Sequence, residues 1–256
     1  MSALGVVEDF VQATKTLTTT ADLRSCVADA VSELGFLYFA VVHHVDFAQS
    51  PPGAVRVSNY PQSFYDAMVQ KKYFADDPVL AASLRTARGF RWDEVGSFVS
   101  LTDRQKDIVA LGAREGFGAG YTLPVNVPGE YAGSCSFVMK VGRTLVENRL
   151  PLLPYLGRLA FESGRRISLQ AGPRAEFESL RLTDRQLDCL VLAARGLSAR
   201  QAALTLGIAQ HTVQQHLDAA RARAGVRSTK QLVIRCLFEG QLTFRDLLPG
   251  RRRRGP

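Results

Sequence analysis

The Lys and Arg residues after Pro173 concentrate positive charge that could bind the phosphates of a polyanion. Residues 1–173 contain 17 Lys+Arg and 17 Asp+Glu, whereas residues 174–256 contain 15 and 7, so the whole formal excess of +8 lies in the last third. Without the run Arg251–Arg254, this segment still has 11 cations against 7 acids. The asymmetry indicates a nucleic acid or an anionic membrane surface as the partner.

Candidate catalytic and metal-binding side chains lack the spacing that their chemistry requires. Four cysteines occur without a CxxC pair, and the sequence contains no GxSxG, no HExxH and no glycine-rich phosphate loop. His43 and His44 are adjacent, but no Cys or carboxylate cluster lies beside them in the sequence. Ser134, Cys135 and Ser136 belong to a strand pattern, not to a nucleophile elbow. We therefore expect neither an enzyme nor a metal or cofactor site.

The length and composition are those of an ordinary globular chain. A length of 256 residues suggests two domains, and the contents of 46% hydrophobic and 22% charged residues argue against extensive disorder. No window approaches the roughly 18–20 uninterrupted apolar residues of a membrane span, and no basic, apolar leader opens the sequence. We expect a cytoplasmic protein without a membrane partner, with its cysteines reduced.

The cationic last third must be positioned by helices alone. Thr183 and Gln186 have the capping-box spacing at the start of the first helix, Ser198 is placed to cap the second, and Gly207 is placed to end it. The predicted helices span 184–195, 199–206, about 211–224 and about 228–239. Two helices joined by a tight turn that contains glycine, the second one polar and cationic, are typical of a helix-turn-helix module.

The neutral first part is predicted to have helices on both flanks of a central sheet, an α/β/α sandwich. Residues 36–42 are β-rich and apolar, and 121–127 and 135–141 have the pattern of two strands joined by a turn at 128–130. Helical patterns occupy 4–17, 20–34, 63–73, 78–87 and 145–169, with Pro151 and Pro154 placed to kink the last one or to mark its true start. A further helix opens at 101–105. The fold class is therefore α/β, with an all-α four-helix domain after it.

The C-terminal segment resembles the LuxR-type helix-turn-helix family. The resemblance rests on roughly 65 residues with the family's spacing: Leu182-Thr183-x-Arg185, Leu190, Ala194, Gly196, Ser198, Ala202, Leu206, Ile208, Thr212-Val213, His216-Leu217, Val226 and Gln231. The N-terminal segment resembles the autoinducer-binding domain of the quorum-sensing branch, through Asn59-Tyr60-Pro61, Asp77-Pro78, Trp92, Gly120 and Pro124. The expected domains are a ligand-binding and dimerisation domain at 1–170, a linker at 171–179, a DNA-binding domain at 180–245 and a basic tail at 246–256.

The resemblance implies a ligand site made of Tyr60, Phe64, Met68, Asp77, Trp92 and Ser136. In the family, the position of Asp77 accepts the amide N–H of an acyl-homoserine lactone. Phe64 and Met68 stand where the family usually has a Trp that donates to the lactone carbonyl and a Tyr that closes over the acyl chain. Phe has no donor, so a lactone carbonyl would lose one hydrogen bond, worth roughly 1–3 kcal/mol if it stays unsatisfied. We expect an acyl-homoserine lactone or a related amide-containing amphiphile with an altered head group.

The resemblance also implies a DNA-binding face on the third predicted helix of the module. Gln214, Gln215 and Asp218 are expected to meet base edges, because Gln can bond adenine and Asp can accept from cytosine. Phosphates are the expected partners of Arg200, Arg221, Arg223, Arg227 and Lys230, with Thr212 at the same face. The departures from the family are Gln186 for Glu, Leu197 for Lys, and Ala219 and Ala220 for Asn and Ile.

These features together predict a homodimeric, ligand-responsive transcription regulator that binds a two-fold operator in double-stranded DNA. Three alternatives stay open. Asp77 is also placed to cap the helix that begins at Pro78. The pocket is filled by side chains such as Phe64 and Met68 if the regulator works without a ligand or through a protein partner. A constitutive architectural DNA-binding protein would bind without sequence preference.

Overall fold

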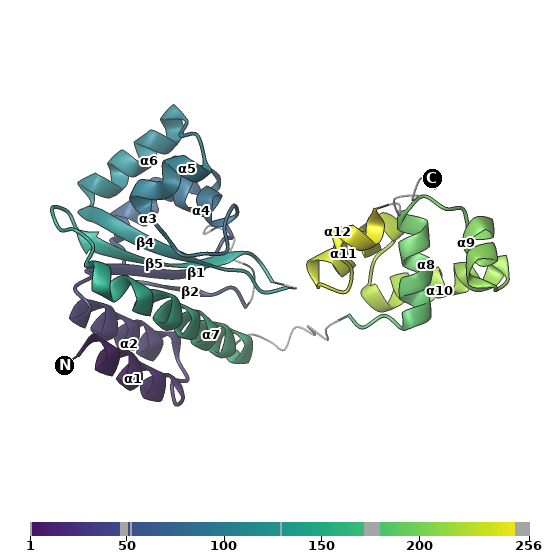
Figure 1. Cartoon of the computed structure of the whole chain (residues 1–256), viewed down its shortest axis with the longest axis horizontal. Coiled ribbons are helices and arrows are strands. Elements are labelled where there is room, and N and C mark those ends of the chain that lie inside the picture. Colours follow the sequence, from purple (N-terminus) through teal and green to yellow (C-terminus); the bar gives the residue numbers. More distant parts are fainter. Residues whose placement is uncertain (1, 47–50, 52, 129, 172–179, 249–256) are drawn as a thin grey trace, which may run out of the picture. The chain divides into compact units, whose positions relative to one another are not determined.

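The computed structural model describes residues 2–46, 51, 53–128, 130–171 and 180–248 (Figure 1). Most of the expected linker and of the expected basic tail, with Arg251–Arg254, therefore lies outside the described residues. A division near Ala175 separates two compact units. Among the described residues, no helix is both long and apolar enough to cross a bilayer.

The first unit is built on a five-stranded sheet with the order β2-β1-β5-β4-β3, in which every neighbouring pair is antiparallel (Figure 1). The strands are β1 (Tyr38–His43), β2 (Arg56–Ser58), β3 (Phe90–Arg91), β4 (Phe117–Val125) and β5 (Gly133–Lys140). The sequence predicted β1, β4 and β5. It missed β2 and β3, because strands of three and two residues at the sheet edges carry too little alternation to be recognised.

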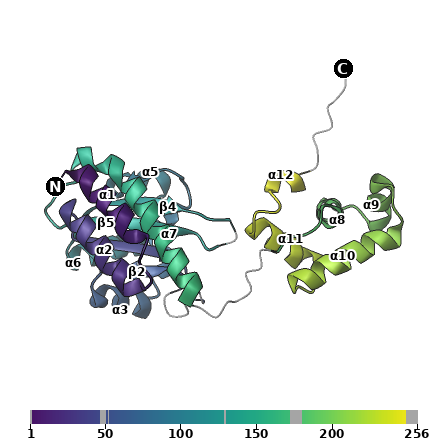
Figure 2. The same cartoon turned by 90° about the horizontal axis from the view of Figure 1, so that it is seen from below.

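Helices cover both faces of the sheet, as the sandwich prediction required. On one face lie α1 (Ala3–Thr14), α2 (Thr20–Glu33) and α7 (Leu153–Ala171), and α1 and α7 pack side by side (Figure 2). On the other face lie α3 (Gln62–Gln70), α4 (Pro78–Ser83), α5 (Val95–Phe98) and α6 (Asp103–Arg114) (Figure 1). Short 3₁₀ turns span Phe74–Asp76, Trp92–Glu94 and Glu147–Leu152.

The helical pattern over 145–169 is divided at its prolines, so that the prolines mark the true start of the α-helix, which is one of the two options that the sequence left open. Residues Glu147–Leu152 form a 3₁₀ helix, and the α-helix begins only at Leu153. Pro151 has no N–H for an α-helical hydrogen bond, whereas Pro154 stands in the first turn of α7, where that N–H would be unpaired anyway.

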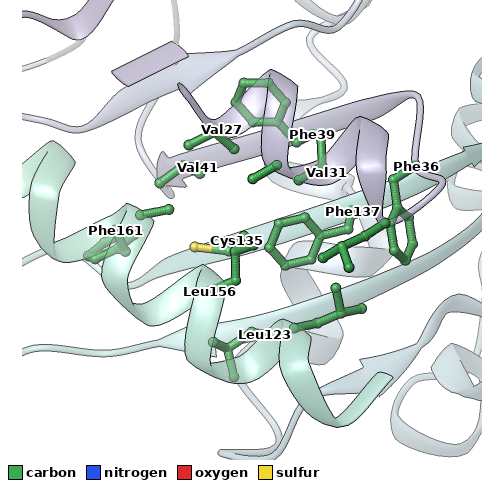
Figure 3. Packing of buried hydrophobic residues seen from close by; sticks show 14 of the residues in the cluster. Val27, Val31, Phe36, Phe39, Val41, Leu123, Cys135, Phe137, Leu156 and Phe161 are labelled. Atoms are coloured by element: carbon green, nitrogen blue, oxygen red, sulfur yellow. The ribbon is translucent and has the colours of Figure 1, made fainter. Parts of the chain in front are cut away.

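Strand alternation divides the sheet into two functionally different faces. The odd-numbered residues of β1 and β5, such as Phe39 and Phe137, join a core with Val27 of α2 and Leu156 of α7 (Figure 3). The even-numbered residues of the same strands point to the opposite face, toward α3, α4 and α6. Small polar side chains such as Ser136 on that face are what make room for a site.

The second unit is entirely helical over its described residues. Its helices are α8 (Asp184–Ala194), α9 (Ala199–Leu206), α10 (Gln210–Ala224), α11 (Thr229–Phe238) and α12 (Phe244–Leu247), the last of which was not predicted. Thr183 and Gln186 form the predicted capping box. Gly207 ends α9 with φ +67°, a left-handed conformation that a side chain would strain, and so allows the tight turn into α10.

Candidate functional site

A cavity of about 160 Å³ lies between the even-numbered face of the sheet and helices α3, α4 and α6. All six side chains that the sequence assigned to a ligand line it: Tyr60, Phe64, Met68, Asp77, Trp92 and Ser136. Phe64 and Met68 come from α3, Trp92 from a 3₁₀ turn and Ser136 from β5, whereas Tyr60 and Asp77 lie in connecting segments, so only the tertiary fold brings them together. A cavity of this volume is comparable to engineered cavities that hold one benzene ring.

One wall of the cavity is a chain of hydrogen-bonded side chains. The indole N–H of Trp92 donates to Thr122 Oγ1 at 2.9 Å, and Thr122 Oγ1 lies 2.9 Å from Ser136 Oγ. Tyr60 lines the same wall beside Ser136, and burial raises the pKa of its phenol well above its ordinary value. Tyr60 is therefore a neutral hydroxyl that can donate to a ligand. Sequence reasoning missed Thr122, although its place between Tyr121 and Leu123 on a strand put it on this face.

Asp77 serves both of the roles that the sequence left open for it, as a helix cap and as part of the cavity wall. Its Oδ1 accepts the backbone N–H groups of Val79 at 2.8 Å and Leu80 at 3.4 Å, which caps α4. Among the described residues, Oδ2 accepts no hydrogen bond. Burial raises the pKa of the carboxyl, and the two backbone hydrogen bonds partly offset that rise. Because Asp77 lines the cavity, its second oxygen is left as an acceptor at the cavity wall.

Aromatic rings close the cavity around Phe117. Its ring centroid lies 4.5 Å from that of Tyr60 and 4.9 Å from that of Phe64, and Met68 belongs to the same cluster with 1% of its surface exposed. The alternation of β4 would turn Phe117 to the other face. A register shift between Phe117 and Gly120 reverses its direction, which is why sequence reasoning did not find it.

Gly120 lets Trp92 approach the sheet. A Cβ on Gly120 would lie 2.3 Å from the indole ring, so no larger residue fits without moving the tryptophan. The hydrogen bond from Trp92 to Thr122 depends on this close approach.

The histidine pair shows no metal-site geometry. His43 Nδ1 accepts the backbone N–H of Val55 at 3.0 Å, and its ring packs 5.0 Å from Phe161. Within the described ranges, no group of three His, Cys, Asp or Glu side chains could hold a metal ion.

The second candidate site is the outer face of α10. Val213 and Leu217 bury the inner face, while Gln214, Gln215 and Asp218 are exposed, as expected for a helix that meets base edges. Thr212 at the start of α10 is half-buried.

The predicted cations divide into tied and untied groups. Arg221 bonds Asp218 and donates to Thr229 Oγ1 at 3.0 Å, and Arg223 donates to the carbonyl of Arg181 at 2.8 Å. By contrast, three exposed cations make no ion pair within the part of the chain that the structure describes: Arg200, Arg227 and Lys230. Arg221 and Asp218 are therefore held by the protein itself, whereas the untied cations are available to phosphates.

Comparisons with known proteins cover both units. Residues 19–163 match the family described as "Autoinducer binding domain", and residues 180–236 match "Bacterial regulatory proteins, luxR family". The transcriptional activator protein AhyR of Aeromonas hydrophila is 24% identical over 214 residues, which cover 82% of this chain and 81% of AhyR. CarR of Pectobacterium carotovorum subsp. carotovorum, also a transcriptional activator, is 22% identical over 224 residues, or 84% and 91% of the two chains.

Solved structures show the same fold at low sequence identity. SdiA of Escherichia coli superposes with a TM-score of 0.65 at 17% identity and covers 96% of this chain and 99% of SdiA. A second structure, of SdiA in complex with octanoyl-rac-glycerol, gives a TM-score of 0.63 at 16% identity, with coverages of 93% and 96%. CepR2 of Burkholderia cenocepacia, described as N-acylhomoserine lactone dependent, matches 66% of this chain and 96% of its own with a TM-score of 0.51 at 17% identity.

Proposed function

Because the chain belongs to the LuxR family of quorum-sensing transcription regulators with an autoinducer-binding domain, we propose that the cavity binds an acyl-homoserine lactone or a related amide-containing amphiphile. The observation that carries this proposal is the convergence of six side chains, five of them polar or aromatic and the sixth a methionine, from distant segments on one cavity. The same cavity is lined by the Asp77 carboxylate, which can accept an N–H, and by the hydroxyl groups of Tyr60 and Ser136, which can donate to a carbonyl, and an amide has both groups.

We assign each polar group of the ligand to one wall. Asp77 Oδ2 accepts the amide N–H, and the Tyr60 hydroxyl, a neutral donor beside Ser136, donates to the acyl carbonyl. The Trp92 N–H already bonds Thr122, so Trp92 contributes its ring face as a wall. These contacts recognise the amide, and the apolar lining receives the tail.

We infer that the head group differs from a homoserine lactone. Phe64 and Met68 present only a ring and a thioether to that end of the cavity, and neither donates a hydrogen bond. The complex of SdiA with octanoyl-rac-glycerol shows that this fold can bind an acyl amphiphile without a lactone ring.

The alternative is a regulator that needs no ligand or answers to a protein partner. Phe64 and Met68 are 7% and 1% exposed, and the remaining cavity of about 160 Å³ is small for an acyl chain. In that case the side chains themselves fill the pocket.

We further propose that the protein acts in the cytoplasm as a homodimer on a two-fold operator. The exposed Gln214 and Gln215 read base edges from the major groove, and Arg200, Arg227 and Lys230 contact phosphates. Two such modules match half-sites about one helical turn apart. Arg221 and Arg223 are bonded to protein groups. They hold α10 in place and lie near the DNA phosphates that the untied cations contact.

Thermal unfolding of the full-length protein separates the two interpretations of the cavity. The panel contains acyl-homoserine lactones, aryl amides and acyl glycerols. A ligand at 100 times its dissociation constant stabilises the folded state by about 2.7 kcal/mol, so a saturable rise in Tm with one class identifies the signal class. A folded, DNA-binding protein that none of them stabilises favours the ligand-independent alternative.

A further inference from the structure

A second polar pair, Ser134 and His44, lies on the cavity face of the sheet. Ser134 lines the cavity and is 1% exposed, two residues along β5 from Ser136. Its Oγ lies 2.9 Å from Nε2 of His44, which directly follows β1. The registers of Val42 with Ser134 and of the His44 N–H with the Ala132 carbonyl place the imidazole beside this serine.

This pair belongs to neither the amide-binding wall nor the core. The amide-binding wall described above uses Ser136 on the row of Thr122, whereas Ser134 pairs with Pro124 and Val42 on the next row. Its only side-chain hydrogen-bonding partner among the described residues is His44. An alanine at position 134 would fill the same space without a buried polar group that needs a hydrogen-bonding partner. The presence of a buried serine and histidine therefore suggests a binding role for the pair.

The protonation of His44 decides what Ser134 offers to the cavity. Burial, with a smaller contribution from His43, lowers the pKa of His44 to about 4, so the imidazole is neutral and carries one N–H. Nδ1 is buried and has no hydrogen-bond partner in the described part of the chain. A buried N–H without an acceptor is rarer and costlier than a bare acceptor, so the hydrogen-bond network assigns the proton to Nε2.

With the proton on Nε2, His44 donates to Ser134 Oγ. The hydroxyl proton of Ser134 then has no acceptor among the described protein groups, and the residue lines the cavity. A buried neutral hydroxyl that has no acceptor for its proton destabilises the empty protein. A ligand oxygen that accepts this hydrogen bond would remove that cost.

We propose that Ser134, oriented by His44, donates a hydrogen bond to an oxygen on the tail of the ligand. The inference rests on the proposed function, since it presumes that an amide-containing amphiphile occupies the cavity. Two strand residues span about 7 Å, so the tail oxygen lies about 7 Å from the carbonyl bound beside Ser136. The ligand class is thus narrowed to amides whose tail bears a hydroxyl or carbonyl group. His44 is a positioning residue that does not itself contact the ligand.

Matched ligand pairs test this without any mutation. One pair is N-(3-phenylpropanoyl)-homoserine lactone with and without a para-hydroxyl, and the other is N-hexanoyl-homoserine lactone with and without a terminal hydroxyl. Both pairs are also made as primary amides of the same acids. Dissociation constants for the full-length protein are measured by calorimetry. We expect one hydroxylated member to bind about 3- to 10-fold more tightly than its partner, as one neutral hydrogen bond allows.

Variants assign the effect to the pair. Ser134→Ala should abolish the preference for the hydroxylated member while it leaves the affinity for the plain member within about twofold. His44→Leu should reduce the preference, and His44→Gln, which keeps an N–H donor near the position of Nε2, should restore part of it. Ser163→Ala is the matched control, because Ser163 is a buried serine on α7 that does not line the cavity.

The outcomes separate this inference from the proposed function. Equal binding within every pair overturns the inference and leaves the amide receptor standing. A preference that survives Ser134→Ala places the tail oxygen elsewhere and also overturns it. If no member of either series binds the folded protein, the proposed amide ligand itself is refuted.

Discussion

The indole N–H of Trp92 lies 2.9 Å from Thr122 Oγ1, so this donor is bonded within the protein. The same hydroxyl oxygen lies 2.9 Å from Ser136 Oγ, so the position of the Ser136 hydroxyl in the cavity depends on a tryptophan two side chains away. The ligand wall is therefore preorganised by interactions that lie behind it. Preorganisation of this kind lowers the entropy that a ligand must lose on binding.

Gly120→Ala tests how strictly this wall depends on the approach of Trp92. The new methyl group would stand 2.3 Å from the indole, so the ring must move and its hydrogen bond to Thr122 must lengthen. We expect the free energy of unfolding to fall by about 1–3 kcal/mol, as for other overpacked cores, and ligand affinity to fall with it. Gly96→Ala is the control, because nothing lies within 4 Å of its added methyl group. Urea unfolding of both variants measures the difference. Equal free energies of unfolding for the two variants would show that Trp92 moves away from the sheet at little cost.

Asp77→Asn should stabilise the empty protein and weaken the bound one. Burial raises the pKa of Asp77, so the folded state holds the carboxyl proton more tightly than the unfolded chain does. That contribution to stability is present below the ordinary pKa and is lost as the pH rises through the raised one, so the carboxylate is unfavourable at pH 7. Asparagine keeps an oxygen that can cap α4.

We therefore expect Asp77→Asn to raise Tm at pH 7 without ligand and to weaken amide binding about 10- to 100-fold, because it replaces a charge-assisted hydrogen bond by a neutral one. Asp76→Asn removes the same charge from the neighbouring residue, whose carboxylate pairs with Arg104 at 2.5 Å on the surface. It should leave ligand affinity unchanged. Thermal scans with and without ligand across pH 4–8 check both effects, and a lower Tm for the empty Asp77→Asn protein would contradict the expected effect of the buried charge.

Phe64→Trp tests the inferred change of head group. The variant places an indole donor at the lactone end of the cavity, next to Tyr60. If the missing donor is what disfavours lactones, the affinity for an acyl-homoserine lactone should rise by up to about tenfold, while the affinity for the matching primary amide should not. Phe64→Tyr, which adds a hydroxyl to a ring of similar size, serves as the comparison. No gain for any lactone would mean that the head group is not selected at this position.

Local signals in the sequence were sufficient for the helices α8 to α11 of the second unit, although they missed α12. Thr183 with Gln186 and the turn at Gly207 depend on interactions within four residues, so the residue types alone indicate them. The cavity is different, because its six predicted residues were found through their spacing in a known family. Phe117 joined them through a register shift, and the role of Thr122 depends on its hydrogen bonds to Trp92 and Ser136, which are properties of the folded sheet.

The roles of the cations in the second unit also could not be predicted from the sequence alone. Arg200 and Arg221 are equally basic in the sequence, and both were assigned to phosphates. In the structure, the Arg221 side chain is 23% exposed and bonds Asp218 and Thr229, which joins α10 to α11, whereas Arg200 is exposed on α9. Composition and spacing do not distinguish a phosphate ligand from a structural arginine, because the difference lies in the neighbours that the fold supplies.

These two arginines give opposite predictions for DNA binding. The DNA association constant K falls as salt is added. Arg200→Ala should reduce the magnitude of the slope of log K against log salt by about 0.9 for each phosphate that is no longer neutralised, and it should leave Tm unchanged. Arg221→Ala removes a bridge between two helices and leaves Asp218 with one fewer partner. It should lower Tm and change the salt slope little. Lys230→Ala, at an exposed cation of α11, should behave as Arg200→Ala does.

The measurement is DNA affinity at several salt concentrations, paired with thermal unfolding of each variant. Gln215→Ala is the control for base reading, since it should reduce the preference for the operator over unrelated DNA without altering the slope. A constitutive architectural protein would instead bind operator and competitor DNA alike at every salt concentration. The contradicting result is that Arg221→Ala reduces the magnitude of the salt slope as much as Arg200→Ala does and leaves Tm unchanged. Arg221 would then leave Asp218 when the protein binds DNA and would contact a phosphate. The division into tied and untied cations would not hold in the complex.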